Sequence, residues 1–86
     1  MYKLLYEKRI RKDLSIIPDG QKKFIYAALK IISNNPYERT KSIKKLVNSD
    51  KYRIRVGNYR IFYKIIKDTV KIYAILHRKD AYKSLP

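Results

Sequence analysis

The C-terminal third of the sequence constrains the fold most, because strand-forming runs alternate there with turn signals. Residues 51–56 alternate between polar and apolar side chains, Gly57-Asn58 is a two-residue turn signal, and 59–67 is rich in residues that favour strands. Asp68-Thr69 predicts a second short turn, before a third strand over 70–77. The sequence therefore predicts an antiparallel meander.

Two-residue loops set the register of this predicted meander. Arg55 should then face Arg60 across the first turn, and Arg60 should face His77 across the second. Side chains alternate between the two faces along each strand, so the register assigns each residue to a face. The predicted apolar face, which should meet the helices, carries Ile54, Val56, Tyr59, Ile61, Tyr63, Ile65, Val70, Ile72, Ala74 and Leu76.

The opposite face is predicted to be basic. It places Arg55, Arg60 and His77 in one row across three strands, with Arg53 two residues along. Like charges directly opposite one another destabilise a sheet, and a phosphate bound among them would remove the repulsion. The alternative is a row of solvated arginines whose stems cover apolar neighbours, and a β-bulge would shift part of the row. The remaining members are Phe62, Lys64, Ile66, Lys71, Tyr73 and Ile75.

The first half of the sequence predicts a strand over 2–6 and two helices. Apolar residues at helical spacing favour one helix over 8–17 and a second that ends near Asn34, with Pro18-Asp19-Gly20 as the break. The two helices should form an antiparallel hairpin. Their predicted apolar stripes are Ile10, Leu14 and Ile17 in the first, and Phe24, Ala27, Ala28, Ile31 and Ile32 in the second.

Residues 37–50 are polar and rich in lysine, and they predict a long connection anchored by Ile43, Leu46 and Val47. The fold class is then α+β, with an N-terminal strand and a helical hairpin packed on an antiparallel meander. The 86 residues suffice for a single domain over 1–86. A domain of this size buries a modest core, and it has no cysteine to add a disulfide, so a bound partner is an expected source of stability.

Charge gives the strongest indication of function. The chain has 22 Lys and Arg against 7 Asp and Glu, a net charge of +15, which favours RNA, DNA or an acidic protein as partner. A merely solvated surface is the alternative. The N-terminus lacks the apolar run of a signal peptide and no stretch is long enough to span a membrane, so we expect a cytoplasmic protein without a membrane partner. Basic groups interleaved with Phe62 and Tyr73 suit single-stranded RNA.

Three segments resemble the RelE/ParE toxin superfamily. They are the run 52–63 (YRIRVGNYRIFY), the run 75–82 (ILHRKDAY) and Lys44-Lys45-Leu46. The order of strand, helical hairpin, connection and meander covers essentially the whole chain. The resemblance implies a type II toxin with an acidic, RelB-like antitoxin as partner. In the RelE branch it implies a ribosome-dependent endoribonuclease that cleaves mRNA in the A site without metal or other cofactor.

The resemblance to the RelE branch also implies the site. It has basic side chains where Arg53, Arg55, Arg60 and Arg78 stand, and a catalytic tyrosine where Tyr82 stands. RelE proteins often have lysines in place of Arg53 and Arg55, and arginine is a poor base. We therefore add His77 to the candidate catalytic residues, because histidine is the side chain that normally titrates near neutrality. The expected RNA-binding residues are Lys44, Lys45, Phe62, Lys64, Tyr73 and Lys79.

Two alternatives remain open from the sequence. The ParE branch implies inhibition of DNA gyrase without nuclease chemistry, on the same fold. A plain RNA- or ribosome-binding module would bind tightly and produce no new RNA ends.

Overall fold

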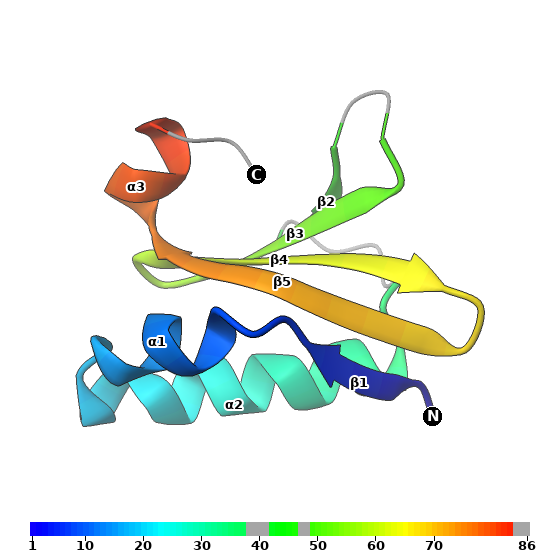
Figure 1. Cartoon of the computed structure of the whole chain (residues 1–86), viewed down its shortest axis with the longest axis horizontal. Coiled ribbons are helices and arrows are strands. Elements are labelled where there is room, and N and C mark those ends of the chain that lie inside the picture. Colours follow the sequence, from blue (N-terminus) through cyan, green and yellow to red (C-terminus); the bar gives the residue numbers. More distant parts are fainter. Residues whose placement is uncertain (38–41, 47–48, 84–86) are drawn as a thin grey trace.

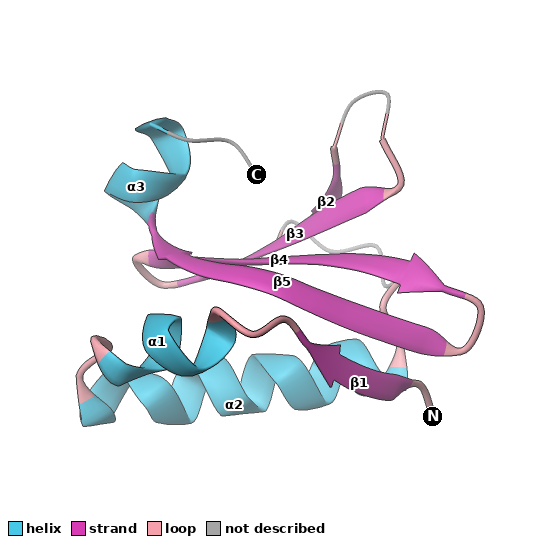
Figure 2. Ribbon diagram, in the orientation of Figure 1, coloured by secondary structure: helices cyan, strands magenta, loops and turns pink. Residues whose placement is uncertain are grey.

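The computed structural model describes residues 1–37, 42–46 and 49–83, with only the backbone of Tyr82 and Lys83. It confirms the α+β class, and Figures 1 and 2 show how the strands and helices are arranged. In chain order the elements are β1 (Lys3–Tyr6), α1 (Ile10–Ser15), α2 (Asp19–Asn34), β2 (Ile43–Lys45), β3 (Lys51–Val56), β4 (Tyr59–Ile66), β5 (Thr69–His77) and α3 (Arg78–Lys83).

The sheet has five strands in the order β1-β5-β4-β3-β2. β1 pairs with β5 in parallel, and the other pairs are antiparallel. Strand β2 was not predicted: it lies inside the expected connection over 37–50, where Val47 is outside the described residues. The helices α1 and α2 cover one face of the sheet, and α3 lies on the other (Figure 1). Below, these are called the helix face and the α3 face.

The register of the first hairpin is confirmed. Arg55 pairs with Arg60 and Val56 with Tyr59 across the Gly57-Asn58 turn. Gly57 has φ +57°, a left-handed conformation that glycine adopts without a steric penalty. The sequence therefore located this turn correctly.

The predicted second turn is wrong. Ile66 pairs with Thr69, so the loop is Lys67-Asp68 and not Asp68-Thr69. Lys67 has φ 55°, a backbone conformation that a lysine rarely adopts. Ile65 consequently pairs with Val70, and not with Ile72, which an Asp68-Thr69 turn would have placed opposite it.

A β-bulge in β5 changes the faces, which the displaced turn had left as predicted for Val70 and Ile72. Tyr63 pairs with Ile72 and Phe62 with Ala74, which leaves Tyr73 as an extra residue in β5. A shift of one residue moves all the following side chains to the opposite face. Ala74 and Leu76, predicted on the helix face, therefore lie on the α3 face, and Ile75 and His77 lie on the helix face.

The main core fills the space between the helix face and the two N-terminal helices. The residues predicted for the apolar stripe of the first helix do enter the core, since Ile10 and Ile17 are buried and Leu14 packs against it. The helix is shorter than the predicted 8–17, however, and α1 ends at Ser15, before Ile17. The stripe predicted for α2 is displaced by one position: Phe24 and Ile31 are about half exposed, at 53% and 46%. The buried residues of α2 are Ile25, Ala28, Leu29, Ile32 and Ser33, and the helix begins at Asp19, so Gly20 lies inside it.

A second, smaller core lies on the α3 face and was not predicted. Phe62, Ala74 and Ala81 are buried there, and three partly buried residues pack against them: Leu46, Tyr73 and Leu76. It joins the sheet to α3 and to the end of β2. Within the described part of the chain, no helix is both long enough and apolar enough to cross a membrane.

The left-handed conformation of Lys67 predicts a stabilising substitution. We expect Lys67→Gly to raise the free energy of unfolding by about 1 kcal/mol, because glycine removes the Cβ clash of this conformation. Chemical denaturation measures the change. Asp68→Gly is the matched control in the same exposed turn: its φ is not positive, so the glycine should lower stability or leave it unchanged. Equal effects of the two substitutions would contradict the prediction.

Candidate nucleic-acid interface

Three arginines of the predicted site share the α3 face. Arg53 and Arg55 occupy alternate positions of β3, so both point to one face. They pair with Phe62 and Arg60 of β4, which lie on the same face as their partners. Their exposure differs: Arg55 is exposed, Arg53 is half-buried and Arg60 is only 8% exposed. Arg55 is therefore the most accessible guanidinium group of the three.

Arg60 is partly committed to the fold. Its Nη1 donates hydrogen bonds to the carbonyl oxygens of Gly57, at 3.0 Å, and of Tyr59, at 2.9 Å. The guanidinium group thus holds the β3–β4 turn. Among the described residues its Nε and Nη2 donate no hydrogen bond.

The predicted row of Arg55, Arg60 and His77 is wrong. Arg60 pairs with Leu76, and His77 pairs with Tyr59, because the second turn lies one residue earlier than predicted and the bulge at Tyr73 shifts the register once more. The His77 ring makes an edge contact with Tyr59 on the helix face, at 5.4 Å between centroids. Its Nδ1 accepts a hydrogen bond from the backbone N–H of Lys79, at 3.2 Å. His77 thus has a structural role at the start of α3, on the opposite side of the sheet from the arginines.

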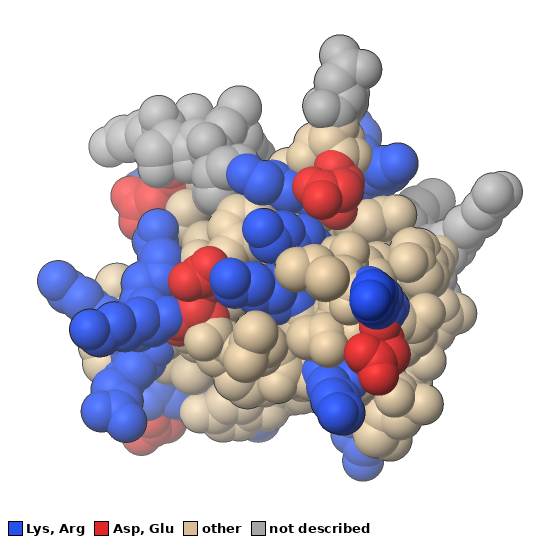
Figure 3. All heavy atoms as spheres, turned by 45° about the vertical axis from the view of Figure 1, so that its right-hand side comes forward, with Lys and Arg blue, Asp and Glu red and all other residues tan. Residues whose placement is uncertain are grey.

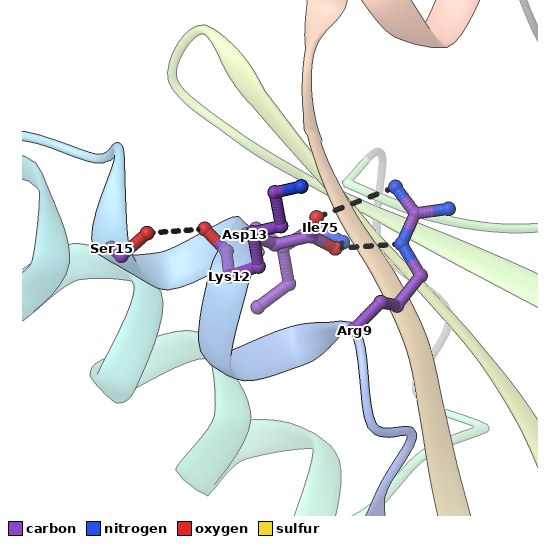
Figure 4. A network of polar contacts seen from close by, with 5 residues as sticks. All are labelled: Arg9, Lys12, Asp13, Ser15 and Ile75. Atoms are coloured by element: carbon purple, nitrogen blue, oxygen red, sulfur yellow. Dashed lines mark hydrogen bonds and ion pairs between the residues drawn. The ribbon is translucent and has the colours of Figure 1, made fainter.

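A buried carboxylate secures the end of β5. β1 pairs with β5 only as far as Ile72, and beyond that point α1 covers the edge of β5. Asp13 of α1 is 9% exposed and accepts a hydrogen bond from the backbone N–H of Ile75, at 3.0 Å. Arg9 donates to both oxygens of this carboxylate, at 3.1 and 3.3 Å (Figure 4).

Sequence reasoning missed Asp13, although there was a signal. The stripe Ile10, Leu14 and Ile17 continues through position 13, three residues after Ile10, and a charged residue on a buried stripe requires a partner. The partner of Asp13 is β5, the strand that carries His77 and leads into Arg78. Asp13 therefore positions the start of α3 through β5.

We expect Asp13→Ala to lower the free energy of unfolding by about 1–3 kcal/mol, because it leaves the buried N–H of Ile75 without an acceptor. Thermal or chemical denaturation measures the loss. Arg9→Ala is the control: its side chain is 51% exposed, so removing that ion pair should cost about 1 kcal/mol or less. The interpretation fails if Arg9→Ala is the more damaging of the two.

The predicted aromatic stacking residues are not both accessible. Phe62 is 1% exposed and belongs to the second core, so it cannot stack on a base in this conformation. Tyr73 lies against Phe62, with ring centroids 6.1 Å apart, and the Lys51 ammonium group is 5.2 Å from the centre of the Tyr73 ring. Burial raises the pKa of Tyr73 to about 12, and the negative charge of Asp50 adds to the rise. Tyr73 is therefore protonated at neutral pH.

The hydroxyl groups of Tyr73 and Tyr63 predict different effects of substitution by phenylalanine. The hydroxyl of Tyr73 has no hydrogen-bond partner among the described residues, whereas that of Tyr63 donates to the carbonyl oxygen of Pro36, at 2.8 Å. We expect Tyr73→Phe to leave the free energy of unfolding unchanged or raise it by up to about 1 kcal/mol. Tyr63→Phe should lower it by about 1 kcal/mol or more. Denaturation curves of both variants check this, and a loss for Tyr73→Phe would contradict it.

The remaining predicted site residues divide between the two faces. Lys44 pairs with Arg53 on the α3 face, whereas Lys45 pairs with Tyr52 and points to the helix face. Arg78 and Lys79 are exposed in the first turn of α3, which the backbone N–H of Arg78 joins to the carbonyl oxygen of Asn58 at 2.7 Å. Tyr82 belongs to α3, and its side chain lies outside the described residues.

Lysines add to the positive charge of the α3 face. Lys64, expected to bind RNA, pairs with Lys51 of β3 and with Lys71 of β5. Figure 3 shows Lys and Arg side chains spread over the visible surface, where they outnumber Asp and Glu. The described residues contain no group of three or more His, Cys, Asp or Glu side chains that could hold a metal ion. The guanidinium and ammonium groups of the α3 face are suited to recognition of anions.

Comparison of the sequence with known proteins identifies the family. The model described as "ParE toxin of type II toxin-antitoxin system, parDE" matches residues 4–82. Toxin RelE3 of Methanocaldococcus jannaschii is 37% identical over 87 residues, covering 98% of this chain and 99% of that protein. Putative toxin RelE1 of the same organism is 35% identical over 81 residues, covering 90% of each chain.

Comparison of the structures agrees. A chain in the crystal structure of a RelB–RelE antitoxin–toxin complex from Methanococcus jannaschii matches with a TM-score of 0.79 at 36% identity, covering 95% of this chain and 99% of that one. The isolated RelE toxin of E. coli matches with a TM-score of 0.75, covering 96% and 97%, and at 20% identity this likeness concerns the fold alone. With matches across nearly its whole length, the chain belongs to the RelE/ParE family of type II toxin–antitoxin systems, as a RelE-like toxin.

Proposed function

We propose that this toxin is a ribosome-dependent endoribonuclease that cleaves mRNA in the A site by attack of a ribose 2′-hydroxyl group. The observation that carries the proposal is the position of Arg53, Arg55 and Arg60 on one face of the sheet, in a chain 37% identical to a RelE toxin. These are positions where the RelE branch has basic residues.

The three arginines suit the charge that such a reaction develops. In the proposed reaction the 2′-oxygen forms a bond to the adjacent phosphorus, and the bond from phosphorus to the 5′-oxygen breaks. The products are a 2′,3′-cyclic phosphate and a 5′-hydroxyl group, which takes up one proton while the 2′-hydroxyl loses one. Guanidinium groups make directional contacts with phosphate oxygens, and they stabilise the extra negative charge of the transition state.

Each arginine contributes differently. The exposed Arg55 is placed to contact the reacting phosphate directly. Arg60 is fixed by its two bonds to turn carbonyls, so it can offer Nε and Nη2 without losing further side-chain freedom. Arg53 stands two residues along β3, and Arg78 approaches from the start of α3.

We assign proton transfer by excluding the unsuitable side chains and by comparing the position of Tyr82 with that of the catalytic tyrosine in the RelE branch. Arginine is a poor base, and Tyr73, with a pKa raised by burial to about 12, is no better at neutral pH. His77 lies on the other side of the sheet and is left out of the mechanism. Tyr82 occupies the position of the catalytic tyrosine of the RelE branch, and we propose it for this step, with the ribosome completing the geometry.

The proposed partner in the cell is an acidic antitoxin. Two RelE chains of similar structure, from Methanococcus jannaschii and Pyrococcus horikoshii OT3, come from complexes with RelB, and a net charge of +15 suits an acidic chain as partner. Binding to the folded toxin alone would also stabilise this small domain. The proposed site of action is the cytoplasm, where the ribosomes are.

The test is cleavage of mRNA on programmed ribosomes. The toxin should produce new RNA ends that carry a cyclic phosphate and a 5′-hydroxyl group. Arg55→Ala should slow this cleavage about 100-fold or more, because it removes a charge that acts in the transition state. Arg60→Ala would not separate catalysis from folding, since Arg60 is nearly buried and holds the turn.

Arg11→Ala is the matched control for Arg55→Ala. It removes one exposed arginine from α1, on the other side of the sheet, and should leave cleavage unchanged. Cleavage that survives Arg55→Ala would exclude this residue from the reaction. Tight binding to ribosomes without any new RNA ends would instead indicate a non-catalytic RNA- or ribosome-binding module.

Inhibition of DNA gyrase is a second candidate, because the matching family model is described as a ParE toxin. In that case the protein should block supercoiling of relaxed plasmid by gyrase and leave ribosome-bound mRNA intact. Running both assays with one preparation distinguishes the two activities.

A further inference from the structure

A row of three lysines crosses the α3 face. Lys64 of β4 pairs directly with Lys51 of β3 on one side and with Lys71 of β5 on the other. All three are half-buried, and they stand on the same face as Arg53 and Arg55. Below, Lys51, Lys64 and Lys71 are called the lysine row.

The lysine row is unfavourable for the fold by itself. Neighbouring strands lie about 4.8 Å apart, and like charges directly opposite one another destabilise a sheet. The two outer members are partly compensated: Lys71 Nζ is 3.1 Å from Glu7 Oε1, and the Lys51 ammonium group lies over the Tyr73 ring. Lys64, which has a lysine on each side, has neither an acidic nor an aromatic partner among the described residues.

The lysine row continues a line of cations from the proposed site. Lys51, Arg53 and Arg55 occupy every second position of β3, so their successive Cα atoms are about 7 Å apart. The row therefore lies about 14 Å from Arg55 on the same face, which is close enough for one strand of RNA to reach both.

We infer that the lysine row is a second phosphate-binding site, which holds the RNA strand at a distance from the scissile linkage. This inference rests on the proposed function and extends it. The RNA follows β3 from Arg55 towards Lys51, and its phosphates lie across the ammonium groups of Lys64 and Lys71. Bound phosphate removes the repulsion within the row, so the row is maintained for binding at the expense of stability. The shared face with Arg53 and Arg55 favours RNA over an acidic protein as its ligand.

The salt dependence of RNA binding tests the inference. The probe is a single-stranded RNA with 2′-O-methyl groups, which cannot be cleaved, and fluorescence anisotropy gives its affinity over a series of salt concentrations. Each phosphate contact contributes about 0.7 to the slope of log K against log salt. The variant with Lys51→Gln, Lys64→Gln and Lys71→Gln together should therefore have a slope smaller by about 2 than the original protein.

The matched control removes the same charge from elsewhere. Lys8→Gln, Arg11→Gln and Lys12→Gln together neutralise three exposed residues in and before α1, on the other side of the sheet, and should leave the slope unchanged. Equal losses in both triple variants would overturn the inference, because they would indicate diffuse attraction. No measurable binding by the original protein would overturn it as well. If poly-glutamate competes for the site as well as RNA does, the inference is also overturned, because this would indicate an acidic protein as the ligand.

A single substitution gives a second, independent readout. Lys64→Thr places a good strand-forming residue between Lys51 and Lys71, and it should raise the melting temperature by about 1–5 °C. The same variant should lower the slope of RNA binding by about 0.7. A gain in stability without a change in slope would indicate a solvated row and overturn the inference.

The outcome is independent of the nuclease assay. If the original protein leaves ribosome-bound mRNA intact while the lysine-row variants change the slope as expected, the proposed cleavage fails and the binding site stands. If cleavage occurs and the slope does not change, the second site fails alone.

Discussion

The extra residue in β5, Tyr73, determines which side chains of this strand lie on each face of the sheet. Before it, Val70 and Ile72 alternate into the main core, as the pattern of the strand requires. After it, the next residues are displaced by one position, so Ile75 joins the main core while Ala74 and Leu76 face α3. A regular strand would have put His77 beside the arginines and left Ala74 in the main core. The bulge thus gives the α3 face the second, smaller core described above.

This second core explains why the α3 face contains both fixed and accessible groups. Phe62 and Ala74 are buried beneath α3, and Arg60 is held at the turn by two carbonyl oxygens. Arg55 and the lysine row lie around this covered region. Arg55 is exposed to solvent, and the three lysines are half-buried. A rigid centre with accessible charges at its border suits a ligand that is held mainly by its phosphates.

The sequence predicted the parts of the fold in which one pattern dominates. The Gly57-Asn58 hairpin was placed correctly because glycine accepts the left-handed conformation and both flanking strands alternate. The second turn was misplaced because it uses Lys67, a residue that gives no signal for such a conformation. In α2 nearly every position from Phe24 to Ile32 is apolar, so periodicity could not choose between stripes one residue apart.

The site was predicted in part, for related reasons. Arg53, Arg55 and Arg60 share a face because the first hairpin is regular, whereas the position of His77 depended on a bulge that the sequence does not signal. Phe62 is buried by contacts with Ala81 and Leu46, from segments whose packing local patterns do not reveal. Asp13 could have been noticed, since a carboxylate on an apolar stripe requires a buried donor.

The parallel pairing of β1 with β5 has a consequence for synthesis of the chain. Residues 3–6 form their sheet contacts with residues 69–72, which are translated much later, and such distant contacts form late and slowly. The nascent protein therefore carries an unpaired β1 until residues 69–72 have left the exit tunnel. Until then the N-terminal segment is open to chaperones and to aggregation, and its capture by β5 completes the sheet.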